Sequence, residues 1–335
     1  MIGHWDLDIG ILHKGMPGQG REIRRRIKSI KSTRQITKAM ELVSAAKMRK
    51  AVANVLATRP YAALAWEVVQ AIVEKTNSRY HALLEERGTI KKIGLILITS
   101  NRGLTGSFNT NIIEMARQYI FHHKEKVNVE ADLVIMGRKG REAMQKRGHT
   151  MIAEFTKLDV NERVEEIRPL ARLVIDEYLK GTYDRIVIAY TDFVSSLVQK
   201  PRVKQLLPLT SDDPYLGAVG KVEAFTRQNH ANTRQAFEGV VEASEGAIED
   251  GYLFEPSPQS VLEGLLPRIV EMQLYQAILE SNASEHSSRM FAMRNATDAA
   301  GEMIDELTLL YNHDRQAGIT REIAEISAGR IAIER

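Results

Sequence analysis

Residues 262–311 read LEGLLPRIVEMQLYQAILESNASEHSSRMFAMRNATDAAGEMIDELTLLY and keep a single heptad register from end to end. Counted from Leu262, the seam positions follow one another at alternating spacings of three and four residues. All of them are apolar except Gln276, His286 and Thr297. The pattern predicts a helix of about 50 residues, about 75 Å long, whose seam faces a partner helix. The three polar positions are interpreted as fixing the pairing register or as facing outward where the coiled coil loosens.

Residues 20–77 form the only other stretch long enough to supply that partner. They are rich in strong helix formers, and the sequence therefore predicts an antiparallel pair of N- and C-terminal helices. Pro60 predicts a break or kink near Arg59, and Pro267 predicts a bend close to the start of the C-terminal helix. The predicted seam of the N-terminal helix slips in register after its third position and consists of Ile23, Ile27, Ile30, Ile36, Met40 and Val43.

The middle of the chain alternates between strand and helix patterns. Short apolar runs predict buried strands, and longer amphipathic stretches between them predict helices. This alternation favours a Rossmann-like α/β domain with a largely parallel sheet. The predicted strands are 91–99, 132–137, 185–190 and an extended stretch 194–208, and the predicted helices are 108–126, 138–147 and 162–180.

Composition excludes several classes of protein. The 335 residues contain no cysteine, which rules out disulfides, thiolate nucleophiles and cysteine metal sites. No run of eighteen apolar residues occurs, and residues 1–20 lack the pattern of a secretory signal, so any membrane link is expected to go through partners.

Two features suggest other kinds of site. Residues 21–50 carry a local net charge of +9 in a chain of net charge +3, and such a basic stripe meets phosphates, an acidic protein surface or simply water. The loop 99–109 follows a predicted strand and precedes a helix, a place where α/β domains bind phosphate. It lacks both common glycine-rich nucleotide motifs, and a tight turn explains Gly103 and Gly106.

Long motifs at both ends and in the middle resemble one family. The chain closely resembles the gamma subunit of F-type ATP synthases of the bacterial type, from about Gly20 to Ile326. The motifs that carry this resemblance are ITKAMELVSAAKMRK (36–50), RPYA (59–62), LLPL (206–209), YLFEPSP (252–258), SEHSSRMFAMRNATDAA (284–300) and IDELTLLYNHDRQAGITREIAEI (304–326).

The resemblance implies a rotor shaft that is not itself an enzyme and needs no cofactor or metal. Its implied partners are three alpha and three beta subunits, the epsilon subunit and the membrane c ring, with one gamma per complex and no nucleic acid. Rotation driven by proton flow through the c ring would couple to ATP synthesis at the beta subunits and regulate ATPase activity. The implied place is the cytoplasmic side of the cell membrane, bound peripherally, and the coupled ion is selected by other subunits.

The resemblance also implies contact residues between rotor and stator. On the N-terminal helix, Met40 matches the methionine that faces an acidic segment of the beta subunit, and basic residues flank it. On the C-terminal helix, four residues match positions that make polar contacts with the surrounding ring. The complete set is Lys38, Met40, Lys47, Arg49, Arg289, Gln316, Thr320 and Glu322.

The chain departs from the family pattern in two segments. Residues 1–19 match nothing expected and are interpreted as a disordered extension, or as the result of a true start at Met16. The acidic segment 210–251 is interpreted as an insertion that is a solvated loop, a brake without cysteine or an added partner contact. The expected division is therefore 1–19, the N-terminal coiled-coil helix 20–77, the α/β domain 78–209, the insertion 210–251 and the C-terminal coiled-coil helix 252–335.

Overall fold

The computed structural model describes residues 19–75, 81–85, 87–126, 129–158, 164–209, 255 and 257–333. The chain divides into two compact units. The terminal unit holds the residues up to Leu42 and from Ala292 onward, and the central unit holds Val43–Phe291. The predicted extension and the acidic segment 210–251 lie outside the described residues, apart from Gln19, which begins the first helix.

Two long helices each contribute residues to both units. Helix α1 spans Gln19–Lys75 and helix α6 spans Pro258–Ile333. Ser257 caps the start of α6, since its hydroxyl accepts a hydrogen bond from the amide of Ser260 at 3.2 Å. Helix α1 does not end near Arg59, and α6 continues through Pro267. No described helix combines the length and apolar character that a membrane crossing requires.

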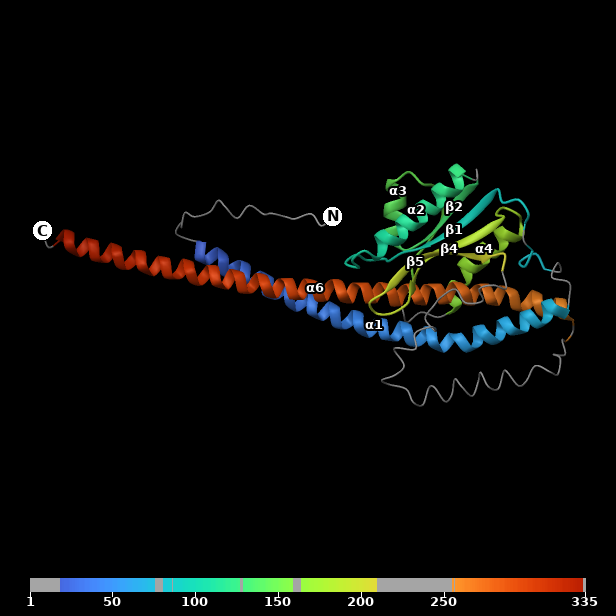
Figure 1. Cartoon of the computed structure of the whole chain (residues 1–335), viewed down its shortest axis with the longest axis horizontal. Helices are drawn as coiled ribbons and strands as arrows, with labels where there is room; N and C mark the ends of the chain where they lie inside the picture. The colour runs from blue at the N-terminus through green and yellow to red at the C-terminus, as the bar shows by residue number, and fades with distance from the viewer. Residues whose placement is uncertain are drawn as a thin grey trace. The chain divides into compact units, whose positions relative to one another are not determined.

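In the terminal unit, α1 and α6 pair in opposite directions (Figure 1). Thr37 is hydrogen-bonded to Thr297 at 2.7 Å between hydroxyl oxygens, and Arg24 donates to the Tyr311 hydroxyl at 3.0 Å. Residues early in α1 therefore contact residues late in α6, as an antiparallel coiled coil requires. The predicted seam of α6 is confirmed here by the buried side chains of Met293, Thr297, Ala300 and Ile304.

The predicted seam of α1 is wrong at Ile36 and Val43. Ile36 and Val43 are exposed, whereas Thr37 and Ser44 are buried. These two buried residues continue the spacing of three and four from Ile23 without a slip. The polar Thr297 of α6 supplies a partner for Thr37, so polar seam positions on both helices match each other and apolar residues of α1 turn outward.

The central unit contains a five-stranded sheet with the order β3-β2-β1-β4-β5. Its strands β1 to β4 are parallel, and β5 joins the edge antiparallel to β4, which confirms a largely parallel α/β sheet. Strand β3 was not predicted, because its five residues alternate in exposure at an edge. The strands are β1 (Lys92–Ile98), β2 (Glu130–Met136), β3 (Met151–Phe155), β4 (Arg185–Phe193) and β5 (Gln199–Leu207).

Helices cover both faces of this sheet (Figure 1). One face packs Ile93, Leu95 and Leu97 of β1 against helix α2 (Phe108–Lys126) and Met144 of helix α3 (Arg138–Lys146). The other face packs Ile96 and Ile98 against helix α4 (Arg168–Leu179), against α1 and against α6. A short 3-10 helix, Val164–Ile167, replaces the first part of the predicted helix 162–180.

A glycine is required where β2 meets α3. Gly137 has a φ of 106°, and a Cβ atom added there would lie 2.2 Å from the carbonyl oxygen of Thr99. This close approach lets β2 end directly beside the end of β1, where the amide of Thr99 donates to the carbonyl of Met136 at 2.8 Å. The loops that follow the parallel strands are thereby gathered at one edge of the sheet.

Candidate functional site

The predicted contact residues of α1 lie largely on its surface. In the terminal unit, Lys38 is exposed and pairs with Glu41 at 3.0 Å, and Met40 is half-buried. Ile36, one turn before Met40, has 58% of its surface exposed. Because residues four apart share one side of a helix, Ile36 and Met40 form an apolar surface beside the charge of Lys38. Ile36 was expected in the seam, so this surface was not predicted from the sequence.

The other two basic residues of α1 that were predicted as contacts, Lys47 and Arg49, belong to the central unit. Arg49 is exposed and Lys47 is half-buried. Nearby on the same helix, Met48 and Ala51 are buried and pack into the core below the sheet. The basic side chains therefore lie on the part of the helix surface that the core does not use.

The predicted contact residues near the end of α6 are all exposed. Gln316, Thr320 and Glu322 lie in the terminal unit, and the Thr320 hydroxyl donates to the backbone carbonyl of Gln316 at 3.0 Å. Ile319 and Ile323, which are 46% and 60% exposed, lie one turn apart on the same stretch of the helix. This end of α6 thus offers an apolar surface mixed with polar groups, a combination typical of protein interfaces.

Arg289 differs from the other predicted contact residues, because it is only 9% exposed. Its guanidinium donates to Glu285 Oε1 at 2.7 Å and lies 3.2 Å from His286 Nδ1. A longer contact of 3.5 Å reaches the carbonyl of Gly103 in the loop after β1. The structure places this side chain inside the central unit, whereas the resemblance implied a polar contact with the surrounding ring.

Glu285 holds a second cation. Lys157, in the loop after β3, donates to Glu285 Oε2 at 2.6 Å, and both residues are buried. Burial raises the pKa of the Glu285 carboxyl, but the nearby charges of Lys157 and Arg289 outweigh it, so the pKa lies below its ordinary value. The i, i+4 spacing of Glu285 and Arg289 was readable from the sequence, whereas Lys157 is brought to them only by the fold.

Several polar groups of the loop 99–109 form hydrogen bonds within the chain. Asn109 accepts a hydrogen bond from the amide of Ser100 at 3.0 Å and donates to the Thr105 hydroxyl at 2.9 Å. Ser288 of α6 donates to the carbonyl of Thr105 at 2.8 Å. Groups that could cradle a phosphate are thus used to close the loop on itself and on α6, which supports the tight-turn interpretation.

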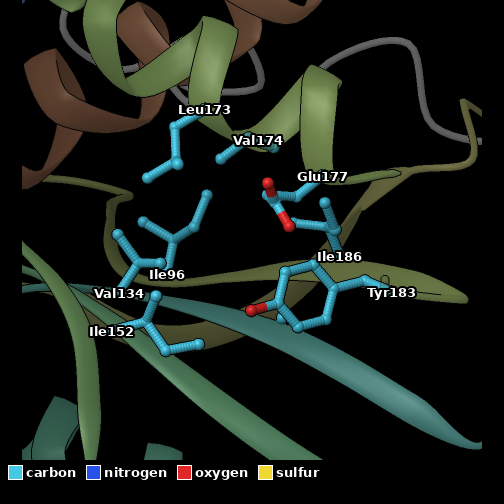
Figure 2. Close-up of a pocket in the computed structure, with 9 residues that line it drawn as sticks. Ile96, Val134, Ile152, Leu173, Val174, Glu177, Tyr183 and Ile186 are labelled. Atoms are coloured by element: carbon cyan, nitrogen blue, oxygen red, sulfur yellow. The ribbon is translucent and has the colours of Figure 1, made fainter. Parts of the chain in front are cut away.

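A small cavity lies between the sheet and α4, lined mainly by aliphatic side chains such as Ile96, Val134 and Val174 (Figure 2). Its polar members have partners, since Glu177 pairs with Lys180 at 2.9 Å and the Tyr183 hydroxyl donates to Asp132 at 3.1 Å. A ligand site ordinarily presents several convergent polar groups that are free to bind. This cavity does not, and it is interpreted as a gap in the packing.

Comparison with known proteins decides the family. The model of a family described as ATP synthase matches residues 19–333. The ATP synthase gamma chain of Roseiflexus castenholzii is 43% identical over 314 residues, which cover 93% of this chain and 98% of the relative. The chain belongs to the ATP synthase gamma chain family. The expectation of a gamma subunit, a non-catalytic chain of that complex, is therefore confirmed.

Other gamma-family relatives agree. The ATP synthase gamma chain of Coxiella burnetii is 40% identical over 317 residues, covering 94% of this chain and 99% of the relative.

Solved structures share the fold. A chain of the Euglena gracilis mitochondrial ATP synthase, in a structure of its OSCP, F1 and c-ring, matches with a TM-score of 0.59 at 21% identity, covering 94% of this chain and 95% of that chain. A chain of the Tetrahymena thermophila mitochondrial ATP synthase central stalk and c-ring matches with a TM-score of 0.54 at 22% identity, covering 78% and 99%. The predicted combination of long terminal helices with an α/β sheet is thus a fold that also occurs in solved ATP synthase structures.

Proposed function

We propose that this gamma-family chain is the rotor shaft of an ATP synthase and couples proton flow through the c ring to ATP synthesis at the beta subunits. The observation that carries the proposal is the match to gamma chains over nearly the full length. This match covers both the terminal helices, which form the shaft, and the α/β domain, which forms its foot. A two-helix shaft transmits a turn because its seam resists sliding, and paired positions such as Thr37 and Thr297 fix the register.

The partners in this proposal are three alpha and three beta subunits around the shaft, with the epsilon subunit and the c ring at the foot. One gamma chain serves each complex, held peripherally at the cytoplasmic side of the cell membrane. We also retain the division into four parts, which are 20–77, an α/β domain 78–209, an insertion 210–251 and 252–335. The first and last parts contain α1 and α6. Each angle of such a shaft would stabilise a different state of each beta site, so rotation becomes a change in nucleotide affinity.

We assign the contact with the stator to residues of the two helices that are exposed or half-buried. On α1 these are Ile36, Lys38, Met40, Lys47 and Arg49, and on α6 they are Gln316, Thr320 and Glu322. Arg289 is left out of this set, because its charge is held by Glu285. Basic groups that face an acidic surface attract it with little demand on geometry, which suits a contact that is made and released in each turn.

The coupling function is tested with the complete complex in lipid vesicles. We expect that ATP hydrolysis drives ion uptake when the chain is present, because the shaft links the beta sites to the c ring. In complexes assembled without the chain, ATP hydrolysis should leave the ion gradient unchanged. Equal ion uptake with and without the chain would contradict the proposed function.

The stator contact is tested by Lys38→Glu in a complex with cognate alpha and beta subunits. Exposed charge contacts are worth about 0.2–1 kcal/mol, so we expect ATP-driven turnover at low salt to fall about 1.4- to five-fold. The loss should shrink at high salt, where such contacts are screened. Lys180→Glu is the matched control, because Lys180 is an exposed lysine that also pairs with a carboxylate three residues away, Glu177. Equal losses in both variants would refute the assignment.

A further inference from the structure

Helix α6 occupies the edge of the sheet where ligands bind in other open α/β folds. That place is the carboxyl edge beside β1 and β4, where the strand order reverses. Here three loops at this edge contact one short stretch of α6. Ser288 donates to Thr105 in the loop after β1, at 2.8 Å, and Ser287 donates to Ser196 in the loop after β4, at 2.5 Å.

The third loop follows β3 and makes both neutral and charged contacts. Asn282 of α6 donates to the carbonyl of Leu158 at 3.1 Å. Lys157, next to it, extends a side chain that is 2% exposed to the carboxylate of Glu285 at 2.6 Å. All of these residues belong to the central unit. The edge of the sheet is thus fastened to α6 by several neutral hydrogen bonds and one buried ion pair.

Lys157 is itself held in place by the sheet. Asn101, in the loop after β1, donates to the carbonyl of Lys157 at 2.9 Å and accepts from its amide at 3.4 Å. The ammonium group lies 5.3 Å from the ring centre of Phe108, the first residue of α2. The lysine is therefore fixed at its backbone and at its charged end, and the direction of its side chain is set by three elements.

Lys157, Glu285 and Arg289 form a cluster of buried charges, and among the described residues the Lys157–Glu285 pair is the ion pair of this cluster that joins α6 to another element. Arg289 reaches the loop after β1 only by a 3.5 Å contact with the neutral carbonyl of Gly103. Glu285 and Arg289 both lie on α6, one turn apart, and their pair would survive without the sheet. A neutral hydrogen bond under load can exchange its partner for water at modest cost. Pulling Lys157 away from Glu285 would instead separate two charges in a buried place, which costs considerably more.

We propose that Lys157 is the positioning residue that fixes the sheet to α6, so that both turn together and the pair with Glu285 stays closed throughout. This inference rests on the proposed rotor function. If the ion pair only stabilised the fold, its removal would change the free energy of unfolding. If the ion pair transmits force between the sheet and α6, its removal should change the number of ions moved per ATP hydrolysed.

The variant Lys157→Met separates these two effects. The cluster carries two positive charges and one negative charge, so removal of the lysine leaves Glu285 and Arg289 as a balanced pair. Methionine is unbranched and fills much of the same space. We therefore expect the melting temperature to stay close to that of the unchanged chain, while the load-bearing link between sheet and helix is lost.

The experiment uses the complete complex in vesicles and measures ion uptake per ATP hydrolysed. Lys157→Met is expected to lower this ratio at least two-fold with ATP hydrolysis retained, and Lys157→Arg is expected to restore it. Lys180→Met, at an exposed lysine–carboxylate pair, should leave the ratio unchanged. A wild-type ratio in an assembled Lys157→Met complex would overturn the inference. If the unchanged complex itself showed no coupled uptake, the proposed function would fail instead.

A second variant covers the case in which Lys157→Met does not assemble. The chain has no cysteine, so Thr105→Cys with Ser288→Cys allows one defined disulfide between the loop after β1 and α6. If the sheet stays in contact with α6 during rotation, the oxidised complex should keep the wild-type ratio of ion uptake to ATP hydrolysis. Loss of activity on oxidation that a reductant reverses would show that this contact must open, which contradicts the inference.

Discussion

The burial and charge partners of single residues in this chain depend on residues distant in sequence. Glu285 is buried between two cations, and the sequence reveals only one of them, Arg289, by its spacing on the helix. Lys157 lies at the far edge of the sheet, so its role follows from the fold alone. The same dependence explains why Arg289, predicted as a surface contact, is buried.

The Glu285 pair leads to a prediction about stability and pH. The pKa of Glu285 is depressed in the folded chain, so its ionised form stabilises the fold above the unfolded value of 4.5. This contribution is lost as the pH falls through the lower folded pKa. Glu285→Gln should cost about 3–5 kcal/mol at neutral pH, because it leaves two buried cations without their counter-charge.

Urea unfolding of the full chain measures this cost. The difference in unfolding free energy between wild type and Glu285→Gln should be largest at pH 7 and shrink as the pH falls below 4.5. Glu177→Gln serves as a control at an exposed pair. A difference that stays constant from pH 7 to pH 3 would contradict the assigned role of the charge.

Elements were predicted well wherever burial and sequence pattern agree. Helix α2 and strand β1 match their predicted ranges closely, because β1 is buried on both faces and α2 covers one of them. Strand β3 was missed, since an edge strand of five residues exposes alternate side chains such as Ile152. In α1, Ile36 is more apolar than Thr37, yet Thr37 occupies the seam because Thr297 faces it.

The threonine pair gives a prediction for the coiled coil. Thr37→Val alone should destabilise the chain by about 0.5–1.5 kcal/mol, because it removes a buried hydrogen bond. Thr37→Val combined with Thr297→Val should be close to neutral, since both partners are replaced by apolar groups of the same shape. Thermal unfolding of the single and double variants measures the coupling. Additive losses would show that the two hydroxyl groups act independently.

The whole molecule makes sense as a member of the ATP synthase gamma chain family. Its long seam, its basic α1 and its α/β sheet are each compatible with other functions when taken alone. The sequence motifs at both ends predicted the family, and the match over residues 19–333 confirms it. What the sequence did not reveal is how α6 fills the edge of the sheet, because that arrangement depends on contacts among three separate loops.

The central claim is that this chain turns inside a ring of alpha and beta subunits. The most direct measurement is single-molecule observation of a bead attached to the α/β domain, with the chain assembled with its cognate subunits and the ring fixed to a surface. The account predicts stepwise rotation in one direction when ATP is added, and none without ATP. A complete complex that hydrolyses ATP while the bead stays still would contradict it.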